Sequence, residues 1–170
     1  MPSPKLPLDL TRLKTHPLET RRSLCQLDEI LVEPSDDPPP CEPRTAQTIQ
    51  HCASVMRDAF KRNATVLLIY GAHLIKNGGQ LLLNQFLDRG LVTHLATNGA
   101  GTIHDWEFAF LGRSTESVRD NVATGTFGAW DETGRNIHLA LLAGGLRGEG
   151  YGRSLGRFIY EDGITLPTTA

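Results

Sequence analysis

Apolar residues recur with a helical period in the stretch that follows a proline-rich start. The segment begins at Thr45, a candidate N-cap. Its apolar side chains at helical spacing are Ile49, Cys52, Ala53, Met56 and Phe60. This pattern predicts an amphipathic helix that packs one face on a sheet.

The next apolar segments predict two parallel strands joined by a helix. Residues 65–71 (TVLLIYG) form a continuous apolar run, typical of a strand buried on both faces of a parallel sheet. A helix of about 14 residues follows, with Gly90 as a candidate C-cap. Residues 91–97 (LVTHLAT) predict the second strand. Strand, helix and strand in this order predict a right-handed βαβ unit.

Small residues follow both predicted strands, where ligands bind in sheets of this kind. Such residues let a ligand approach main-chain N–H groups at the start of the following helix. The candidate cofactor-binding residues are Gly71, Ala72, His73, Thr97, Asn98, Gly99, Ala100 and Gly101. Glycine-rich turns also occur in units that bind nothing, so turn geometry alone is the alternative interpretation.

Three ionisable residues follow the second turn, and we interpret them as candidate catalytic residues. His104 can carry a proton near neutral pH, and a carboxylate can orient it. Glu107 lies three residues after His104 and therefore shares its helix face, whereas the adjacent Asp105 does not. A helix start that favours acidic side chains explains Asp105 and Glu107 without catalysis. His73, His104 and Asp105 lack the close spacing of metal ligands, and we expect no metal.

The remaining segments predict a proline-rich arm and a helical end. Residues 33–43 (EPSDDPPPCEP) favour an extended linker, so we divide the chain into an arm, 1–43, and a domain, 44–170. Within the arm, residues 24–32 predict a strand or a helical turn. Residues 115–161 predict helices. Residues 143–154 favour a connection between two helices over a phosphate-binding loop that uses Arg147 and Arg153.

Composition excludes several classes of partner. A chain of 170 residues with 39% hydrophobic residues suits one compact domain. A net charge of −2 does not favour nucleic acid. The start of the chain has no apolar signal segment, and no apolar run is long enough to span a bilayer. Three cysteines without CxxC spacing suit reduced thiols. We therefore expect a cytoplasmic protein without membrane or nucleic-acid partners.

The segments IYGAHLIKNGGQLLLNQFLDRG and VTHLATNGAGTIHDWEFAFLG resemble the N-terminal half of deoxyhypusine synthase. They resemble more closely a bacterial and archaeal group described as deoxyhypusine synthase-like. In the synthase a small, polar turn follows one strand, a glycine lies in the next helix, and a Thr-Thr-Ala-Gly-Gly turn follows the second strand. The matching positions are Ala72 and His73, Gly78, and residues 97–101. The resemblance covers residues 64–112, extends to about residue 160 for the group alone, and implies a Rossmann-like fold with an NAD-binding edge.

The chain departs from the synthase at two points. Two consecutive glutamates after the synthase's glycine turn are replaced by Ile103 and His104, and the following aspartate is matched by Asp105. The synthase's catalytic lysine and spermidine-binding residues lie in a C-terminal half that has no counterpart here. Two strands do not make a stable parallel sheet alone. We therefore expect a Rossmann-like parallel sheet with flanking helices that is incomplete or completed by homo-oligomerisation.

A second resemblance involves the same turn. The run NGAGTIHDWE is similar to a Gly-Asn-Ala-x-Ala-x-His-Asp-x-Glu segment in the NAD-dependent ornithine cyclodeaminase-like domain of bifunctional arginine dihydrolases. His104, Asp105 and Glu107 match that segment, and the preceding glycine and asparagine occur in swapped order. This resemblance implies the same cofactor with an amino-acid substrate instead of a polyamine.

The sequence thus predicts a deoxyhypusine synthase-like protein that binds NAD and acts on a small-molecule amine or amino acid by hydride transfer. As an NAD-dependent transferase or oxidoreductase, it would use His104 as acid and base, oriented by Asp105 or Glu107. Two alternatives stay open. One is a truncated or regulatory dinucleotide-binding module without chemistry, and the other is an ornithine cyclodeaminase-like enzyme.

Overall fold

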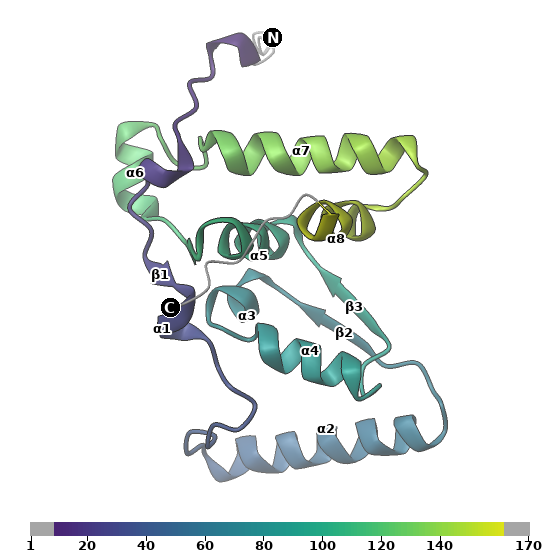
Figure 1. Ribbon diagram of the computed structural model, residues 1–170. Coiled ribbons are helices and arrows are strands. Elements are labelled where there is room, and N and C mark those ends of the chain that lie inside the picture. Colours follow the sequence, from purple (N-terminus) through teal and green to yellow (C-terminus); the bar gives the residue numbers. More distant parts are fainter. Residues whose placement is uncertain (1–8, 162–170) are drawn as a thin grey trace, which may run out of the picture. The chain divides into compact units, whose positions relative to one another are not determined.

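The computed structural model describes residues 9–161, which combine helices with short strands in an α/β fold (Figure 1). These residues form two compact units. We call Cys25–Thr115 the sheet unit, and residues 9–24 with 116–161 the helical unit. The predicted boundary at residue 43 lies inside the sheet unit and stays a prediction.

The sheet unit contains the predicted βαβ arrangement. Its elements are β1 (Cys25–Gln26), α1 (Leu27–Ile30), α2 (Pro43–Lys61), β2 (Leu67–Tyr70), α3 (Ala72–Lys76), α4 (Gln80–Asp88), β3 (His94–Thr97), α5 (Gly99–Leu111) and β4 (Arg113–Ser114). Strands β2 and β3 are parallel, with Leu67 opposite His94 and Tyr70 opposite Thr97. Both strands are shorter than predicted, and together they form a two-stranded sheet in the described part of the chain.

The crossover between β2 and β3 contains two helices where the sequence predicts one. Helix α3 ends at Lys76 and α4 begins at Gln80. Gly78 between them has a φ of 84°, and a Cβ there would overlap the carbonyl oxygen of Ile30. Its own carbonyl accepts a hydrogen bond from Val32 N at 3.0 Å. The helix breaks at Gly78 because only glycine permits this close approach to the end of α1.

The core of the sheet unit lies on one face of the parallel sheet. Ile75, Leu83 and Phe108 form a buried cluster, against which Leu68 and Tyr70 pack. The side chains that alternate with these strand residues, Leu67 and Ile69, are exposed. The prediction of a strand buried on both faces is therefore wrong, because in the described chain helices cover one face alone.

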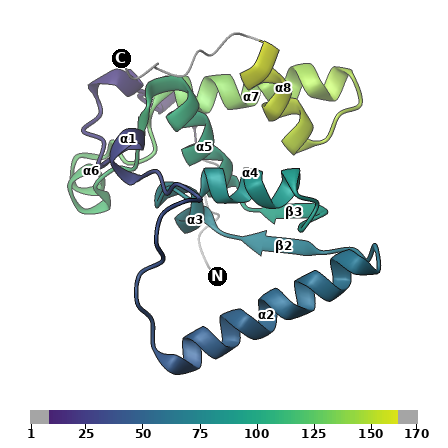
Figure 2. The same cartoon turned by 60° about the horizontal axis from the view of Figure 1, so that its bottom comes forward.

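Helix α2 has the predicted amphipathic sequence but does not pack as predicted. It begins at Pro43, because proline suits the first helical turn, and not after Thr45. Among its residues only Ala59 is buried in the described structure, and Ile49 and Phe60 are exposed. Figure 2 shows α2 lying apart from β2 and β3 along most of its length.

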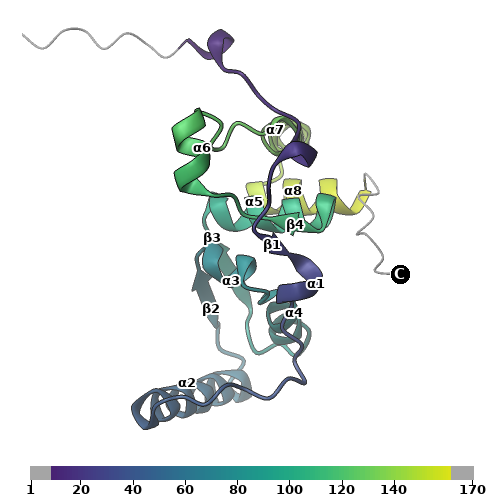
Figure 3. The ribbon, with the colours of Figure 1, turned by 90° about the vertical axis from the view of Figure 1, so that its left-hand side faces the viewer.

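The arm segment 24–32 contains both structures that its sequence allowed. Strand β1 pairs antiparallel with β4, with Cys25 opposite Ser114 and Gln26 opposite Arg113 (Figure 3). Helix α1 follows directly, and Leu27 N donates to the carbonyl of Gly112 at 2.8 Å. These contacts fix the end of α5 and the start of β4.

The helical unit confirms the helices predicted for residues 115–161. It consists of two 3-10 turns, η1 (Leu10–Arg12) and η2 (Leu18–Thr20), and the helices α6 (Val118–Thr124), α7 (Asp131–Leu146) and α8 (Tyr151–Glu161). Helices α7 and α8 pack closely at Gly144, where a Cβ would overlap the hydroxyl of Ser154. Leu18 N donates to a carboxylate oxygen of Glu132 at 2.6 Å, which attaches η2 to α7.

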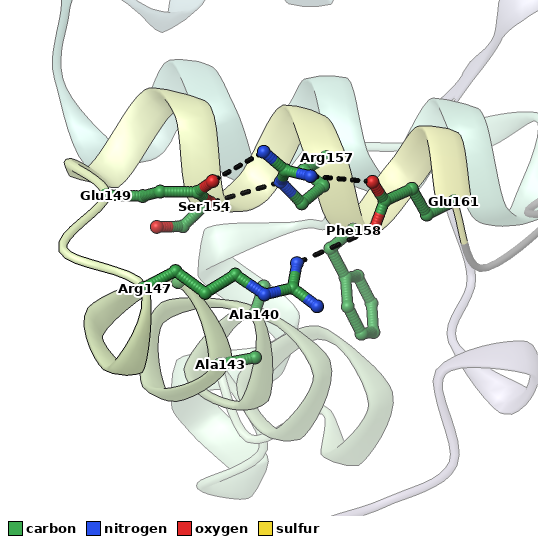
Figure 4. A pocket seen from close by; sticks show the side chains of 9 residues that line it. Ala140, Ala143, Arg147, Glu149, Ser154, Arg157, Phe158 and Glu161 are labelled. Carbon is green, nitrogen blue, oxygen red and sulfur yellow. Dashed lines mark hydrogen bonds and ion pairs between the residues drawn. The ribbon is translucent and has the colours of Figure 1, made fainter.

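The glycine-rich segment 143–154 connects two helices. Residues 147–150 form the connection between α7 and α8. Charged residues line a small cavity beside it, and they pair with one another (Figure 4). Arg157 lies 2.6 Å from Glu149, and Arg147 lies 3.6 Å from Glu161. This pairing supports the interpretation as a helix connection over that as a phosphate loop.

Within residues 9–161, no helix is long and apolar enough to cross a membrane.

Candidate functional site

The two turns predicted to bind a ligand lie side by side. Tyr70 and Thr97 are opposite one another at the carboxyl ends of β2 and β3. Gly71 and Asn98 follow them, and a Cβ built on Gly71 would lie 4.0 Å from Nδ2 of Asn98. We call residues 71–73 and 97–101 the turn edge. Its members are exposed except Ala72, which is half-buried, and Gly101, which is buried.

The turn edge includes the well-formed N-terminus of helix α5. Asn98 is the N-cap, and its Oδ1 accepts a hydrogen bond from Gly101 N at 3.0 Å. A Cβ on Gly101 would overlap the hydroxyl of Thr97, so a larger residue there would displace the Thr97 side chain. A Cβ on Gly99 would meet nothing within 4 Å. The exposed first turn of α5 therefore presents N–H groups and the positive end of the helix dipole to solvent.

A tyrosine and a carboxylate adjoin this edge. Desolvation raises the pKa of Tyr70, the nearby charge of Asp105 raises it further, and a hydrogen bond with Thr97 opposes them. Desolvation also raises the pKa of Asp105. By accessible area Asp105 is exposed, so water reaches part of a carboxyl group that protein atoms surround elsewhere. Asp105 and Tyr70 thus bring a proton-binding pair to the end of the sheet.

His104 and Glu107 meet at one buried hydroxyl, that of Ser114. Ser114 Oγ donates to Oε2 of Glu107 at 2.5 Å and lies 2.8 Å from Nδ1 of His104. The serine is 0% exposed and the glutamate 1% exposed, whereas His104 is half-buried. The predicted shared face of His104 and Glu107 is confirmed, although the two side chains are joined by Ser114. Asp105 lies on another side of α5, near Tyr70.

This chain of hydrogen bonds fixes the tautomer of His104. A serine hydroxyl has one proton, and that proton goes to the Glu107 carboxylate. The hydroxyl oxygen must then accept, so Nδ1 of His104 carries the hydrogen. In the neutral ring, Nε2 is the nitrogen that takes up a proton. Because Ser114 lies between the other two groups, this order differs from that of a serine nucleophile activated directly by histidine.

One further sequence candidate, His73, is itself part of the turn edge. His73 is exposed in the first turn of α3. Among the residues that the structure describes, no group of three or more His, Cys, Asp or Glu side chains could hold a metal ion.

Sequence reasoning missed Ser114 and Tyr70. The chain offered little signal for either residue, because Ser114 is brought to His104 by the pairing of β4 with β1. Tyr70 looked like one more apolar residue of its strand.

Comparisons with known proteins found no matching family model, no matching curated protein and no matching solved structure.

Proposed function

We propose that the chain is a Rossmann-like, deoxyhypusine synthase-like protein that binds NAD at the turn edge. One observation carries the proposal: two exposed turns lie together at the carboxyl ends of parallel strands, with Gly71 close to Asn98. Dinucleotides bind at this place in doubly wound sheets, where backbone approaches the pyrophosphate. Both sequence resemblances, to deoxyhypusine synthase and to the ornithine cyclodeaminase-like domain, imply the same cofactor.

Each part of the edge has a matching part of the cofactor. The first N–H groups of α5 and its dipole suit the pyrophosphate. Gly99 leaves open space, so no side chain keeps a phosphate away from the backbone. Thr97 and Asn98 offer hydroxyl and amide groups to a ribose or to the nicotinamide. We further propose a cytoplasmic location, which the free thiols of Cys25, Cys41 and Cys52 support.

A pair of glycine substitutions tests the site. Gly99→Asp adds a negative charge at the first position of α5 without steric conflict, because nothing lies within 4 Å of its Cβ. A carboxylate there suits the helix dipole but repels the pyrophosphate, which we expect to weaken NAD binding about tenfold or more. Gly134→Asp makes the same change in the first turns of α7, also in open space, and should leave NAD affinity unchanged. Equal NAD affinity of the two variants would contradict the proposed site.

A second function, hydride transfer from an amine or amino-acid carbon to NAD, is favoured by the Glu107–Ser114–His104 chain. These two hydrogen bonds hold His104 in one tautomer, as a general base requires. Asp105 lies close enough to Tyr70, beside the turn edge, for its charge to raise the pKa of the tyrosine. At this place its carboxylate can orient a substrate cation. We expect His104→Ala to abolish NADH formation with amine or amino-acid substrates while NAD binding is retained. The exposed His138→Ala serves as the matched control.

The outcome separates the remaining alternatives. Turnover with an ornithine-type amino acid and none with polyamines would favour the cyclodeaminase-like activity. An absence of turnover in the unmodified protein, with NAD bound, would favour the non-catalytic dinucleotide-binding module.

A further inference from the structure

Within the described residues, one face of the parallel sheet is exposed, and its β2 side chains are apolar. Leu67 is 53% exposed and Ile69 is 73% exposed, on the side of β2 that faces away from the core cluster. Across the strand pair they lie beside His94 and Ala96 of β3. A sheet face of this composition is normally covered by a helix.

The same chain carries an amphipathic helix whose apolar stripe is only partly covered within residues 9–161: Met56 is half-buried, whereas both ends of the stripe are exposed. On α2, Ile49 is 58% exposed and Phe60 is 50% exposed, and the stripe between them includes Met56. An isolated helix in water is stabilised mainly by packing its apolar face. In the part of the chain that the structure describes, the sheet unit thus contains a helix that is not packed on a sheet and a sheet face that no helix covers.

The connection between α2 and β2 holds the helix away from its own sheet. Arg62 N and Ala64 N both donate to the carbonyl of Ala59, at 3.1 and 2.9 Å, and Asn63 between them has a φ of 52°. Phe60 contacts the turn after α4, since its ring carbon lies 3.5 Å from a Cβ built on Gly90. This hydrogen-bonded turn sets the direction in which α2 leaves the sheet (Figures 1 and 2).

We propose that α2 of one chain packs its apolar stripe on the uncovered β2–β3 face of a second copy, and that the second copy returns the same contact. Such an exchange is isologous and closes as a symmetric dimer. It also adds a covering helix to each two-stranded sheet, which is too small to be stable alone.

The surfaces are large enough for this dimer. A buried aromatic side chain covers roughly 200 Å² and a leucine or isoleucine side chain about 130 Å², so the exposed parts of Leu67, Ile69, Ile49 and Phe60 amount to about 340 Å² per chain. Two chains would together cover about 680 Å² of apolar surface. That corresponds to the apolar share of an interface of about 1,200 Å², the lower end of the range for stable interfaces.

Mixing two variants tests the exchange. Ile49→Asp alters the helix stripe and Ile69→Lys alters the sheet face, and both residues are exposed, so each chain should still fold. We expect the unmodified protein to have twice the chain mass by light scattering, and each variant alone to have the mass of one chain. Mixed together, the two variants should regain the double mass, because an intact helix meets an intact sheet face and the two new charges are opposite.

Leu142→Asp and Leu142→Lys, at an apolar α7 position that is 68% exposed, should leave the double mass unchanged. Circular dichroism verifies folding, and Leu67→Lys replaces Ile69→Lys if that chain unfolds. The proposal is overturned by a single-chain mass for the unmodified protein, which would mean that α2 closes on its own sheet or meets another protein. It is equally overturned if the mixture fails to regain the double mass.

Discussion

Ser114 is the residue on which the buried polar chain of the sheet unit depends. It donates to Glu107 and accepts from His104, and none of its surface is exposed. A buried carboxylate is costly unless hydrogen bonds compensate its lost hydration. The hydroxyl therefore serves stability as well as the orientation of His104.

We expect Ser114→Ala to lower the free energy of unfolding by about 1–3 kcal/mol, because it removes a hydrogen-bond donor from a buried carboxylate. Urea denaturation followed by circular dichroism measures this difference. The exposed Ser35→Ala, in the same unit, should change the free energy of unfolding by less than about 0.5 kcal/mol. Equal effects of the two substitutions would show that the Glu107 contact contributes nothing.

The Asp105 carboxyl group is expected to lower the free energy of unfolding in a pH-dependent way, whereas the Ser114 hydroxyl raises it. Desolvation raises its pKa in the folded protein above the ordinary value of 3.8, so the folded state holds this proton more tightly than the unfolded state. The free energy of unfolding therefore falls as pH rises from the unfolded-state pKa through the folded-state pKa, and the loss is complete above the folded-state pKa.

Asp105→Asn should accordingly raise the free energy of unfolding at neutral pH, and this gain should vanish below the unfolded-state pKa. Denaturation curves at neutral and acid pH, with the exposed Asp37→Asn as the charge-matched control, measure the effect. The substitution should also lower the pKa of Tyr70, whose upward shift partly depends on Asp105. A variant less stable at neutral pH would contradict this description of the carboxyl group.

The sequence could predict residues of the site only where spacing on one helix, or position after neighbouring strands, brings those residues together. Spacing on one helix predicted the shared face of His104 and Glu107, and the turns after two strands predicted the neighbourhood of Gly71 and Asn98. Ser114 could not be found in this way, because it depends on a two-residue strand paired with β1, far away in sequence.

At the scale of elements, alanine substitutions at two adjacent glycines of α7 are expected to change the free energy of unfolding in opposite directions. A Cβ on Gly144 would overlap Ser154 of α8, whereas a Cβ on Gly145 meets nothing within 4 Å. Gly144→Ala should therefore lower the free energy of unfolding by about 1–3 kcal/mol through overpacking. Gly145→Ala should raise it by up to about 1 kcal/mol, because alanine favours the helix. Thermal unfolding of both variants measures the difference, and effects of equal sign would contradict the close packing of α7 on α8.

Periodicity predicted which elements exist better than it predicted where they end. The helices after residue 115 and the pair β2 and β3 follow directly from apolar patterns. The break at Gly78 does not, since it arises from the contact with Ile30, which is distant in sequence. The unpacked state of α2 also lay beyond the pattern, because an apolar stripe predicts a partner without saying which chain supplies it.

For the molecule as a whole, the sequence predicted an α/β protein with a sheet too small to stand alone. The division into a sheet unit and a helical unit was not predicted, because the first unit includes part of the arm and the second joins residues 9–24 to the C-terminal helices. The turn edge, Asp105 and the Ser114 chain all lie within the sheet unit. The proposed cofactor site is therefore built from one unit.

Bound cofactor should stabilise the folded protein by mass action. NAD at a hundred times its dissociation constant is expected to raise the free energy of unfolding by about 2.7 kcal/mol. Thermal unfolding with and without NAD measures this, and Gly99→Asp should show a much smaller rise than Gly134→Asp. Equal rises in both variants would place the binding elsewhere.

Calorimetric titration of the purified protein with NAD and NADH tests the central claim most directly, with the molecular mass determined on the same sample. Saturable binding of one dinucleotide per chain, weakened in Gly99→Asp and kept in Gly134→Asp, is the predicted result. A well-folded protein of defined mass that binds neither NAD nor NADH would contradict the claim. The glycines of the turn edge would then serve only the geometry of the turns.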